Sequence, residues 1–122
     1  MKNSDEQSQL ALSGALADAV AAWLQHLIHE RGHARLTCEA YERDVRQFLT
    51  YLTTKLGYPP CLPDLARLEL GAFRGFLASR RRQGTSSRSL ARSVSALRSF
   101  FRWLETDDTV KNRTVHAVAR PK

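Results

Sequence analysis

Apolar side chains recur every three or four residues along most of this chain, which is the period of an amphipathic α-helix. No stretch alternates apolar and polar residues with the period of two that a half-buried strand shows. The pattern therefore predicts an all-α protein. The principal helices are expected at about 13–29, 37–56, 69–83 and 87–104, followed by a short helix at about 112–119.

The helix at 87–104 has the most regular apolar stripe. Its members are Leu90, Val94, Leu97, Phe101 and Leu104. Similar stripes run through the earlier helices, with the following members: Leu16, Val20, Trp23, Leu24, Leu27 and Ile28; Tyr41, Val45, Phe48, Leu49 and Leu52; Leu70, Phe73, Phe76 and Leu77. One buried stripe per helix is what a compact four-helix bundle requires.

Residues with strong local preferences predict where the helices begin and end. Thr37 is expected to cap the second helix, with Leu36 and Tyr41 packing around that cap as a hydrophobic staple. Asp64 is expected to cap a short turn before the third helix. Ser86 or Ser87 is expected to cap the fourth helix. Gly84 stands where a helix end favours a left-handed residue.

These elements divide the chain into three parts. Residues 1–12 are polar and are expected to form a flexible tail. Residues 13–119 are expected to fold as one helical domain. Residues 120–122 have the composition expected at the beginning of a linker.

The charge balance predicts a polyanionic partner. The chain has 122 residues with 19 Lys and Arg against 12 Asp and Glu, giving a formal net charge of +7. Most of the basic residues are arginines, whose guanidinium fork matches phosphate oxygens and guanine edges. Nucleic acid is the first candidate partner, and an anionic membrane surface is the second.

Positive charge is concentrated in one part of the sequence. No carboxylate interrupts the segment 70–104, whereas the first thirty residues lean acidic. The charged residues of this segment are Arg74, Arg80, Arg81, Arg82, Arg88, Arg92, Arg98 and Arg102. Such asymmetry predicts one surface for a polyanion and another for a different contact.

The fourth helix separates its apolar and basic residues. At ~100° per residue the apolar stripe covers about 80°, and the arginines fall in an arc of about 120° roughly opposite. This arginine arc comprises Arg88, Arg92, Arg98 and Arg102, with Ser95 and Ser99 inside it. An ordinary solvated helix face also carries charge, but it usually mixes signs to form ion pairs. The uniform sign favours contact with DNA phosphates.

The second helix gives a weaker signal of the same kind. Its outer face carries Arg43, Arg46 and Gln47, as well as Glu39 and Glu42. Ion pairing within the helix therefore explains this face nearly as well as contact with DNA does. The three arginines at 80–82 lie at a helix end, where they also interact favourably with the helix dipole.

Other chemistry finds little support in the sequence. Cys38 and Cys61 have no metal-binding spacing, and the histidines at 26, 29 and 33 have no completing ligands, so no metal and no cofactor are expected. No catalytic motif, secretory signal or membrane-length apolar run is present. We therefore expect a cytoplasmic protein with no membrane contact and no catalytic residues in this chain.

Two segments carry a family resemblance. Residues 37–52 follow the pattern T-x-x-x-Y-x-x-D-[LV]-x-x-F-L-x-[FY]-L, and residues 89–104 follow S-x-x-R-x-[LV]-S-A-L-R-x-F-[YF]-x-[FW]-L. In this order and spacing the chain resembles the N-terminal, core-binding half of Xer-type tyrosine recombinases and phage integrases. The resemblance covers about residues 23–122. It departs from the usual family pattern at Asn112, which Arg113 follows where many members have proline.

The resemblance implies a SAM-like bundle of four helices arranged as two crossed pairs. It also implies that the second and fourth helices face double-stranded DNA, and that the first contacts homologous protomers in a DNA-bound tetramer. The catalytic residues of the family belong to a second half, so this fragment is expected to be monomeric and inactive alone. The expected DNA contacts are Arg88, Arg92, Ser95, Arg98, Ser99 and Arg102, then Thr37, Arg43, Arg46 and Gln47.

Two other functions also fit the residues. A stand-alone helical regulator could use the same basic helix to bind DNA without any enzyme. A protein-interaction module could turn the same face toward an acidic partner or a membrane.

Overall fold

A computed structural model describes residues 14–121 of the chain. The predicted tail at 1–12 lies outside this range. Within it the protein is all-α, as predicted, and no strand occurs in the described part. The elements are α2 (Gly14–His29), α3 (Arg35–Leu56), α4 (Leu62–Ala66), α5 (Leu70–Arg82), α6 (Ser87–Thr106) and the 3₁₀ helix η1 (Thr114–Ala117).

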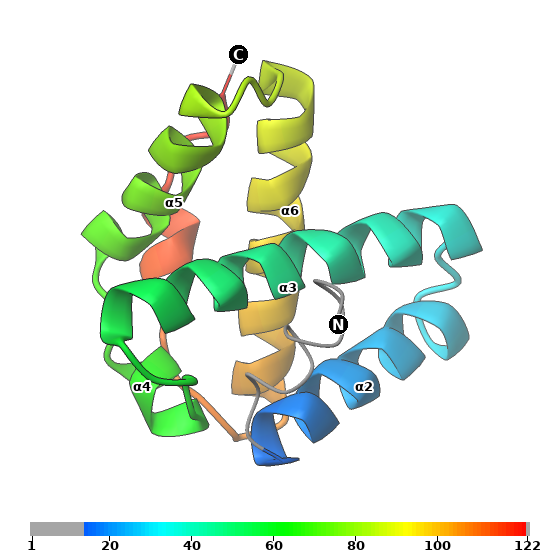
Figure 1. Cartoon of the computed structure of the whole chain (residues 1–122). Helices are drawn as coiled ribbons and strands as arrows, with labels where there is room; N and C mark the ends of the chain where they lie inside the picture. Colours follow the sequence, from blue (N-terminus) through cyan, green and yellow to red (C-terminus); the bar gives the residue numbers. More distant parts are fainter. Residues whose placement is uncertain (1–13, 122) are drawn as a thin grey trace, which may run out of the picture.

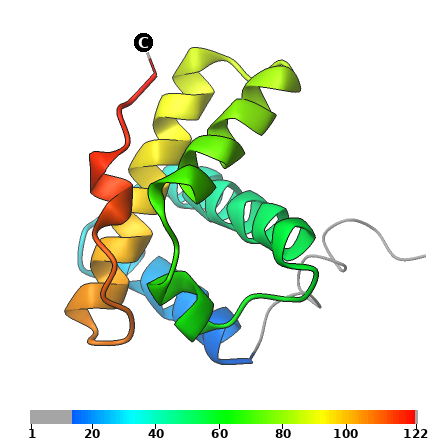
Figure 2. The same ribbon diagram turned by 90° about the vertical axis from the view of Figure 1, so that its left-hand side faces the viewer.

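The long helices form two hairpins that cross each other. Helices α2 and α3 lie side by side, and α3 passes steeply across α6 (Figure 1). Seen from the side, α5 and α6 form the second hairpin, with η1 and the C-terminal segment beside α6 (Figure 2). Helix α6 contacts α2, α3, α5 and η1, so it is the central element of the bundle. This arrangement confirms the orthogonal four-helix bundle.

Aromatic side chains join the two hairpins in the core. Phe73 of α5 stacks on Phe48 of α3, with ring centroids 5.1 Å apart, and meets Phe101 of α6 edge-on at 5.4 Å. Trp23 of α2 meets Phe100 of α6 edge-on at 5.2 Å. All five rings are fully buried. Because offset and edge-on pairs are the favoured aromatic geometries, these contacts stabilise the crossing of the helices.

The buried face of α6 is wider than its apolar stripe. Ser93, Ala96 and Phe100 are buried together with the predicted residues at 90, 94, 97, 101 and 104. The reason is that α3 and α2 cover one flank of α6 while α5 and η1 cover the other. Near the end of α2, Ile28 was predicted to belong to the buried stripe, but it is 41% exposed.

The predicted start of the second helix was wrong. Helix α3 begins at Arg35, its N-cap is Ala34, and no side chain caps it. Thr37 therefore lies inside the first turn and is exposed. Leu36 is 72% exposed and cannot form the expected staple. The helix extends further because Ala34 already accepts the first helical hydrogen bond, from the backbone N–H of Cys38 at 3.0 Å.

Other predicted ends are confirmed. The hydroxyl of Ser86 accepts a hydrogen bond from the backbone N–H of Ser89 at 3.2 Å, so Ser86 is the cap of α6. Gly84 adopts the left-handed conformation with φ of 92°. Asp64 acts differently from the prediction: Cys61 is the N-cap of α4, and the Asp64 carboxylate accepts the Cys61 backbone N–H at 3.0 Å.

The C-terminal segment is held by Asn112 and forms less helix than predicted, since only η1 is helical there. The buried Asn112 amide donates from Nδ2 to the carbonyl oxygens of Leu65 at 2.9 Å and Leu68 at 3.0 Å. Its Oδ1 accepts the backbone N–H of Thr114 at 2.9 Å. One side chain therefore ties the α4–α5 connection to the start of η1.

Gly75 allows α5 to approach α3 closely. A Cβ atom at this position would lie 2.5 Å from the Tyr51 hydroxyl oxygen. Gly71, on the same helix, would meet nothing within 4 Å. Of these two glycines, only Gly75 is at a position where the packing of α5 against α3 leaves no room for a side chain.

Candidate nucleic-acid interface

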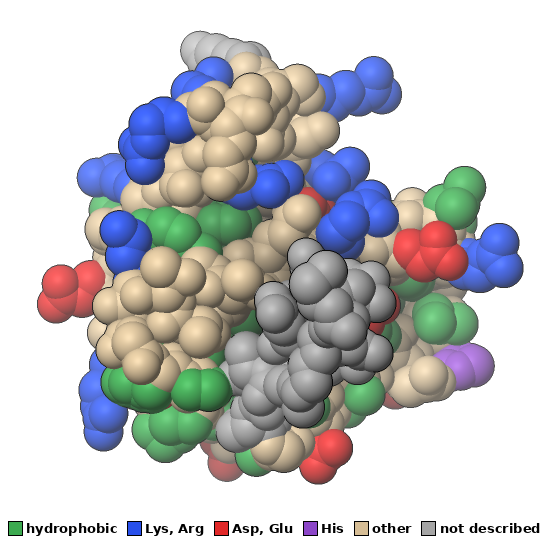
Figure 3. All heavy atoms as spheres, in the orientation of Figure 1, with side chains coloured by type: hydrophobic (Ala, Val, Ile, Leu, Met, Phe, Trp, Pro, Cys, Tyr) green, Lys and Arg blue, Asp and Glu red, His purple; other side chains and the backbone are tan. Residues whose placement is uncertain are grey.

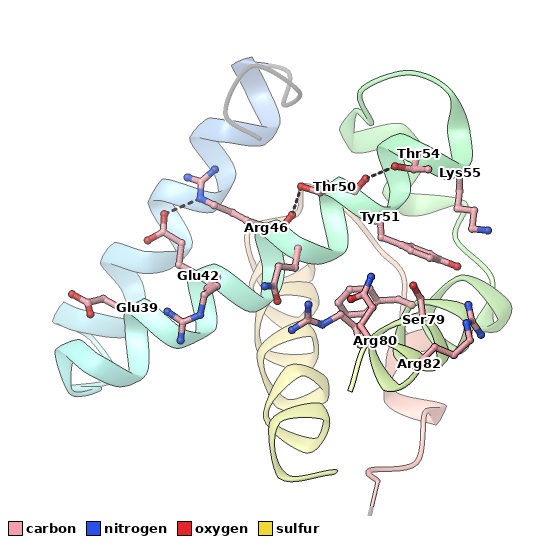
Figure 4. Close-up of a pocket in the computed structure, with 14 residues that line it drawn as sticks. Glu39, Glu42, Arg46, Thr50, Tyr51, Thr54, Lys55, Ser79, Arg80 and Arg82 are labelled. Atoms are coloured by element: carbon pink, nitrogen blue, oxygen red, sulfur yellow. Dashed lines mark hydrogen bonds and ion pairs between the residues drawn. The ribbon is translucent and has the colours of Figure 1, made fainter. Parts of the chain in front are cut away.

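A polar groove of about 900 Å³ lies between α3 and α5. Helix α3 contributes Arg43, Arg46 and Gln47, and the end of α5 contributes Arg80 and Arg82. Ser79, Arg80 and Arg82 extend from α5 on the same side of α3 as Tyr51, whereas Glu42 and Arg46 extend from α3 on the side away from α5 (Figure 4). Lys and Arg side chains also gather over this part of the molecular surface, near α5 and the beginning of α6 (Figure 3). We call this surface the α3–α5 groove.

Some of the charge in this groove is neutralised by neighbours on α3. The Nε atom of Arg46 lies 2.9 Å from a carboxylate oxygen of Glu42, one helical turn earlier. The ion pairing considered as an alternative for this helix is therefore present at Arg46. Arg43 is exposed and takes part in none of the ion pairs among residues 14–121. Its charge remains available to a ligand.

Two buried polar atoms in the groove have no hydrogen-bond partner within the described part of the chain. They are Oε1 of Gln47 and Nε of Arg80. A buried polar atom without a partner costs free energy, and a ligand that supplied the missing partner would recover it. The Arg80 donor, beside several cationic groups, suits an anion. The Gln47 oxygen needs a hydrogen-bond donor, which the edges of nucleic-acid bases present.

Arg92 is held inside the fold by a carboxylate of α3. Its Nε and Nη2 atoms lie 2.8 and 3.1 Å from the two carboxylate oxygens of Asp44. Asp44 is only 1% exposed and also accepts the Ser93 hydroxyl at 3.1 Å. The hydrogen bonds to Asp44 raise the pKa of Arg92. The pair fixes α6 against α3 while 38% of the Arg92 side chain stays exposed.

Arg88 lies one turn earlier on α6 and has a different environment. It is exposed and belongs to none of the ion pairs formed by the described residues. With Arg43 on α3, it contributes unneutralised positive charge to the two crossing helices. Thr37 is exposed in the first turn of α3 and does not line the groove.

The other residues of the predicted arginine arc line a separate hollow. Ser95, Arg98, Ser99 and Arg102 border a space of about 510 Å³ between α6, the end of α2 and the C-terminal segment. Two of them have contacts within the fold: Arg98 donates to the carbonyl of Val118, and Ser99 accepts Nε1–H of Trp23 at 3.0 Å. The sequence predicted a single basic face, and the structure divides it between two places.

Part of the α3–α5 groove was not predicted from the sequence. Arg80 and Arg82 were predicted to interact with the helix dipole as well as with a polyanion, and no role was predicted for Lys55 or Ser79, which also line the groove. The absence of carboxylates from 70–104 was the available signal for the arginines. Which of them would face α3 depends on how the two hairpins cross.

No cluster of three or more His, Cys, Asp or Glu side chains in residues 14–121 could hold a metal ion. None of the helices in this range is long and apolar enough to cross a membrane.

Comparison with known proteins agrees with this fold. Residues 20–107 match the sequence model of the phage integrase N-terminal SAM-like domain, so the chain belongs to that family. Helices α3, α5 and α6 all lie inside the matched region.

Individual relatives are tyrosine recombinases. The chain is 46% identical over 100 residues to "Tyrosine recombinase XerC" of Rhizobium meliloti, covering 82% of this chain and 31% of that protein. It is 44% identical over 107 residues to the protein of the same name from Methylobacterium nodulans, covering 88% and 33%. The chain thus spans about a third of the length of these relatives. No solved structure gave a significant match.

Proposed function

We propose that this chain is the DNA-gripping N-terminal domain of a XerC-like tyrosine recombinase. Double-stranded DNA would lie against the α3–α5 groove and the adjoining first turns of α6. The whole protein would cut and rejoin DNA at a specific site, as in the resolution of chromosome dimers. The nucleophile and its partners would belong to the part of the recombinase that this chain does not match.

The observation that carries this proposal is the unneutralised positive charge around the groove. Arg43 and Arg88 form no ion pair within the described residues, and Arg80 has a buried Nε without a partner. Like charges held this close repel one another, and a row of phosphates would remove that repulsion. Phosphate contacts supply most of the affinity in such complexes and set the register of the protein on the duplex.

The proposed contacts have different roles. Arg43, Arg88, Arg80 and Arg82 would bind phosphates, and Gln47 could reach a phosphate or a base edge. Arg92 would mainly hold α6 in position through its contact with Asp44. The exposed part of its guanidinium group would contact DNA.

The remaining residues proposed from the sequence are placed less directly. Arg46 would have to exchange Glu42 for phosphate. Thr37 would lie at the margin of the surface, and Ser95, Arg98, Ser99 and Arg102 would be reached only by DNA that extends around α6.

Assembly follows from the same proposal. Full-length protomers would meet as a tetramer on DNA, with α2 at a contact between neighbours. The 122-residue chain alone would bind DNA as a monomer and would not cleave it.

Backbone amide NMR signals in a titration with a recombination half-site test the placement of DNA. We expect the largest shifts in α3, the end of α5 and the beginning of α6, and small shifts in the first turns of α2. Shifts concentrated on α2 and α4, with α3 and α6 unchanged, would contradict the proposed surface.

A further inference from the structure

The hollow beside α2 collects positive charge that the fold does not neutralise. Four arginines line it, namely Arg31 from the turn after α2, Arg98 and Arg102 from α6, and Arg120 from the C-terminal segment. None of them belongs to an ion pair among the described residues. The hollow shares no lining residue with the α3–α5 groove.

The nearby carboxylates are already committed to other partners. Glu30 lies 2.9 Å from Nδ1 of His26, and Glu105 lies 2.9 Å from Nε of Arg113. The cationic groups consequently act on one another: burial, Arg120 and Arg102 lower the pKa of Arg98. Guanidinium groups keep their charge in proteins, so this crowding is a cost that an anion would relieve.

The hollow also contains a hydrogen-bond donor that has no partner among the described residues. The Nε of Arg98 is buried and has no partner within residues 14–121, although its Nη2 donates to Val118. The hydroxyls of Ser95 and Ser99 and the rings of His33 and His116 line the same space. Arginines present their donors in a planar fork that matches oxyanions, and such charge-assisted hydrogen bonds are the strong ones.

We propose that this hollow is an oxyanion-binding site for a phosphate group, with Arg98, Arg102 and Arg120 as its principal ligands. Phosphate fits better than carboxylate because the hollow offers more donors than two carboxylate oxygens can accept. A volume of about 510 Å³ admits a phosphate together with the group that carries it. The proposal shares Arg98 and Arg102 with the more distant DNA contacts proposed above, but it does not rest on DNA lying in the α3–α5 groove, with which the hollow has no lining residue in common.

The phosphate could belong to a nucleic-acid backbone or to a small phosphorylated molecule. Both present the same chemistry to the arginines. The binding experiment therefore uses inorganic phosphate first, and then a duplex.

The test follows the imidazole signals of the 122-residue chain by NMR during a titration with inorganic phosphate. His116 is the reporter, because burial, Arg102 and Arg98 lower its pKa. The other charged groups acting on it are Glu105 of α6 and Arg113 ahead of η1. Bound phosphate should raise the His116 pKa and shift its signals in a saturable manner.

Paired variants separate the site from a general charge effect. Arg102→Gln with Arg120→Gln removes two exposed ligands and leaves the Arg98 contact with Val118 intact. This double variant should weaken phosphate binding by about tenfold or more. Arg67→Gln with Arg74→Gln removes the same charge from exposed positions outside the hollow and should change it less than about twofold.

Three results would overturn the proposal. They are the absence of a saturable change at His116, equal weakening in both double variants, and binding of an acidic peptide but not of phosphate. Repeating the comparison with a duplex identifies the source. Duplex affinity lost in Arg102→Gln/Arg120→Gln supports the site as a holder of backbone phosphates, and unchanged duplex affinity with lost phosphate binding supports a small phosphorylated ligand.

Discussion

At the scale of single residues, the Asp44–Arg92 pair joins the two family-like segments. Asp44 lies in the first segment and Arg92 in the second, and their bidentate contact joins α3 to α6. Sequence alone placed Arg92 in the arginine arc because of its angular position on the fourth helix. It could not show the contact, because the contact depends on which helix lies beside Arg92 in the fold.

Removing Arg92 and removing the charge of Asp44 should lower the stability of the protein by different amounts. Arg92→Ala leaves the buried Asp44 carboxylate without its cation and should lower the free energy of unfolding by about 2–3 kcal/mol. Asp44→Asn leaves only a partly exposed arginine and should cost about 1–2 kcal/mol. Urea unfolding of each variant measures the two values.

A double variant provides the check on this pair. Arg92→Ala combined with Asp44→Asn should be less destabilised than the sum of the single changes, because the second change removes the stranded charge. Arg88→Ala, at an exposed position, should change stability by less than about 0.5 kcal/mol. Additive losses would mean that the two side chains do not act as a pair.

His116 makes stability depend on pH. Its pKa is lowered in the fold from an ordinary value near 6.5, mainly by burial and by Arg102 and Arg98. The unfolded chain therefore takes up the proton first as pH falls, and stability should decline below about pH 6.5. His116→Gln should show a smaller loss between pH 7.5 and 5.5 in urea unfolding. Identical pH profiles would rule out this residue as the cause.

At the scale of elements, periodicity predicted every principal helix but not all of their ends. Ser86 and Gly84 marked ends correctly because their preferences are local. The start of α3 was missed because Ala34 has no capping side chain and Thr37 resembles a cap. Asn112 was expected to start a helix, and it stabilises instead the packing of two distant segments, which no local pattern records.

The close approach of α5 to α3 predicts opposite effects for two glycines. Gly71→Ala meets no atom and should stabilise the protein by about 0.5 kcal/mol through its higher helix propensity. Gly75→Ala should destabilise it by about 1–3 kcal/mol, because the new methyl group overlaps the Tyr51 hydroxyl. Thermal unfolding measures both changes.

Tyr51→Phe tests the cause at Gly75. It removes the hydroxyl oxygen at 2.5 Å and leaves the next ring atom at 3.6 Å, an ordinary contact. Gly75→Ala should therefore cost much less in the Tyr51→Phe background than in the wild-type chain. An equal cost in both backgrounds would place the origin of the effect elsewhere.

At the scale of the whole molecule, α6 carries positive charge toward two different surfaces. Arg92 in its early part pairs with Asp44 of α3, the helix that forms one wall of the α3–α5 groove, and its later turns border the hollow beside α2. The sequence predicted the sign of this charge and the helix that bears it. It could not predict that the arginines of α6 divide between two surfaces, because that depends on the fold: α3 packs against one part of α6 and the C-terminal segment lies beside another.

The most direct test of the central claim is DNA affinity across a salt series. Fluorescence anisotropy of the 122-residue chain with a duplex of ~30 base pairs should show steep loss of affinity as salt rises, from the release of several counterions. Arg43→Gln and Arg88→Gln should each reduce the slope of log affinity against log salt by about one, while Arg67→Gln leaves it unchanged. No binding at low salt, or equal effects from all three variants, would contradict the account of this chain as a DNA-gripping domain.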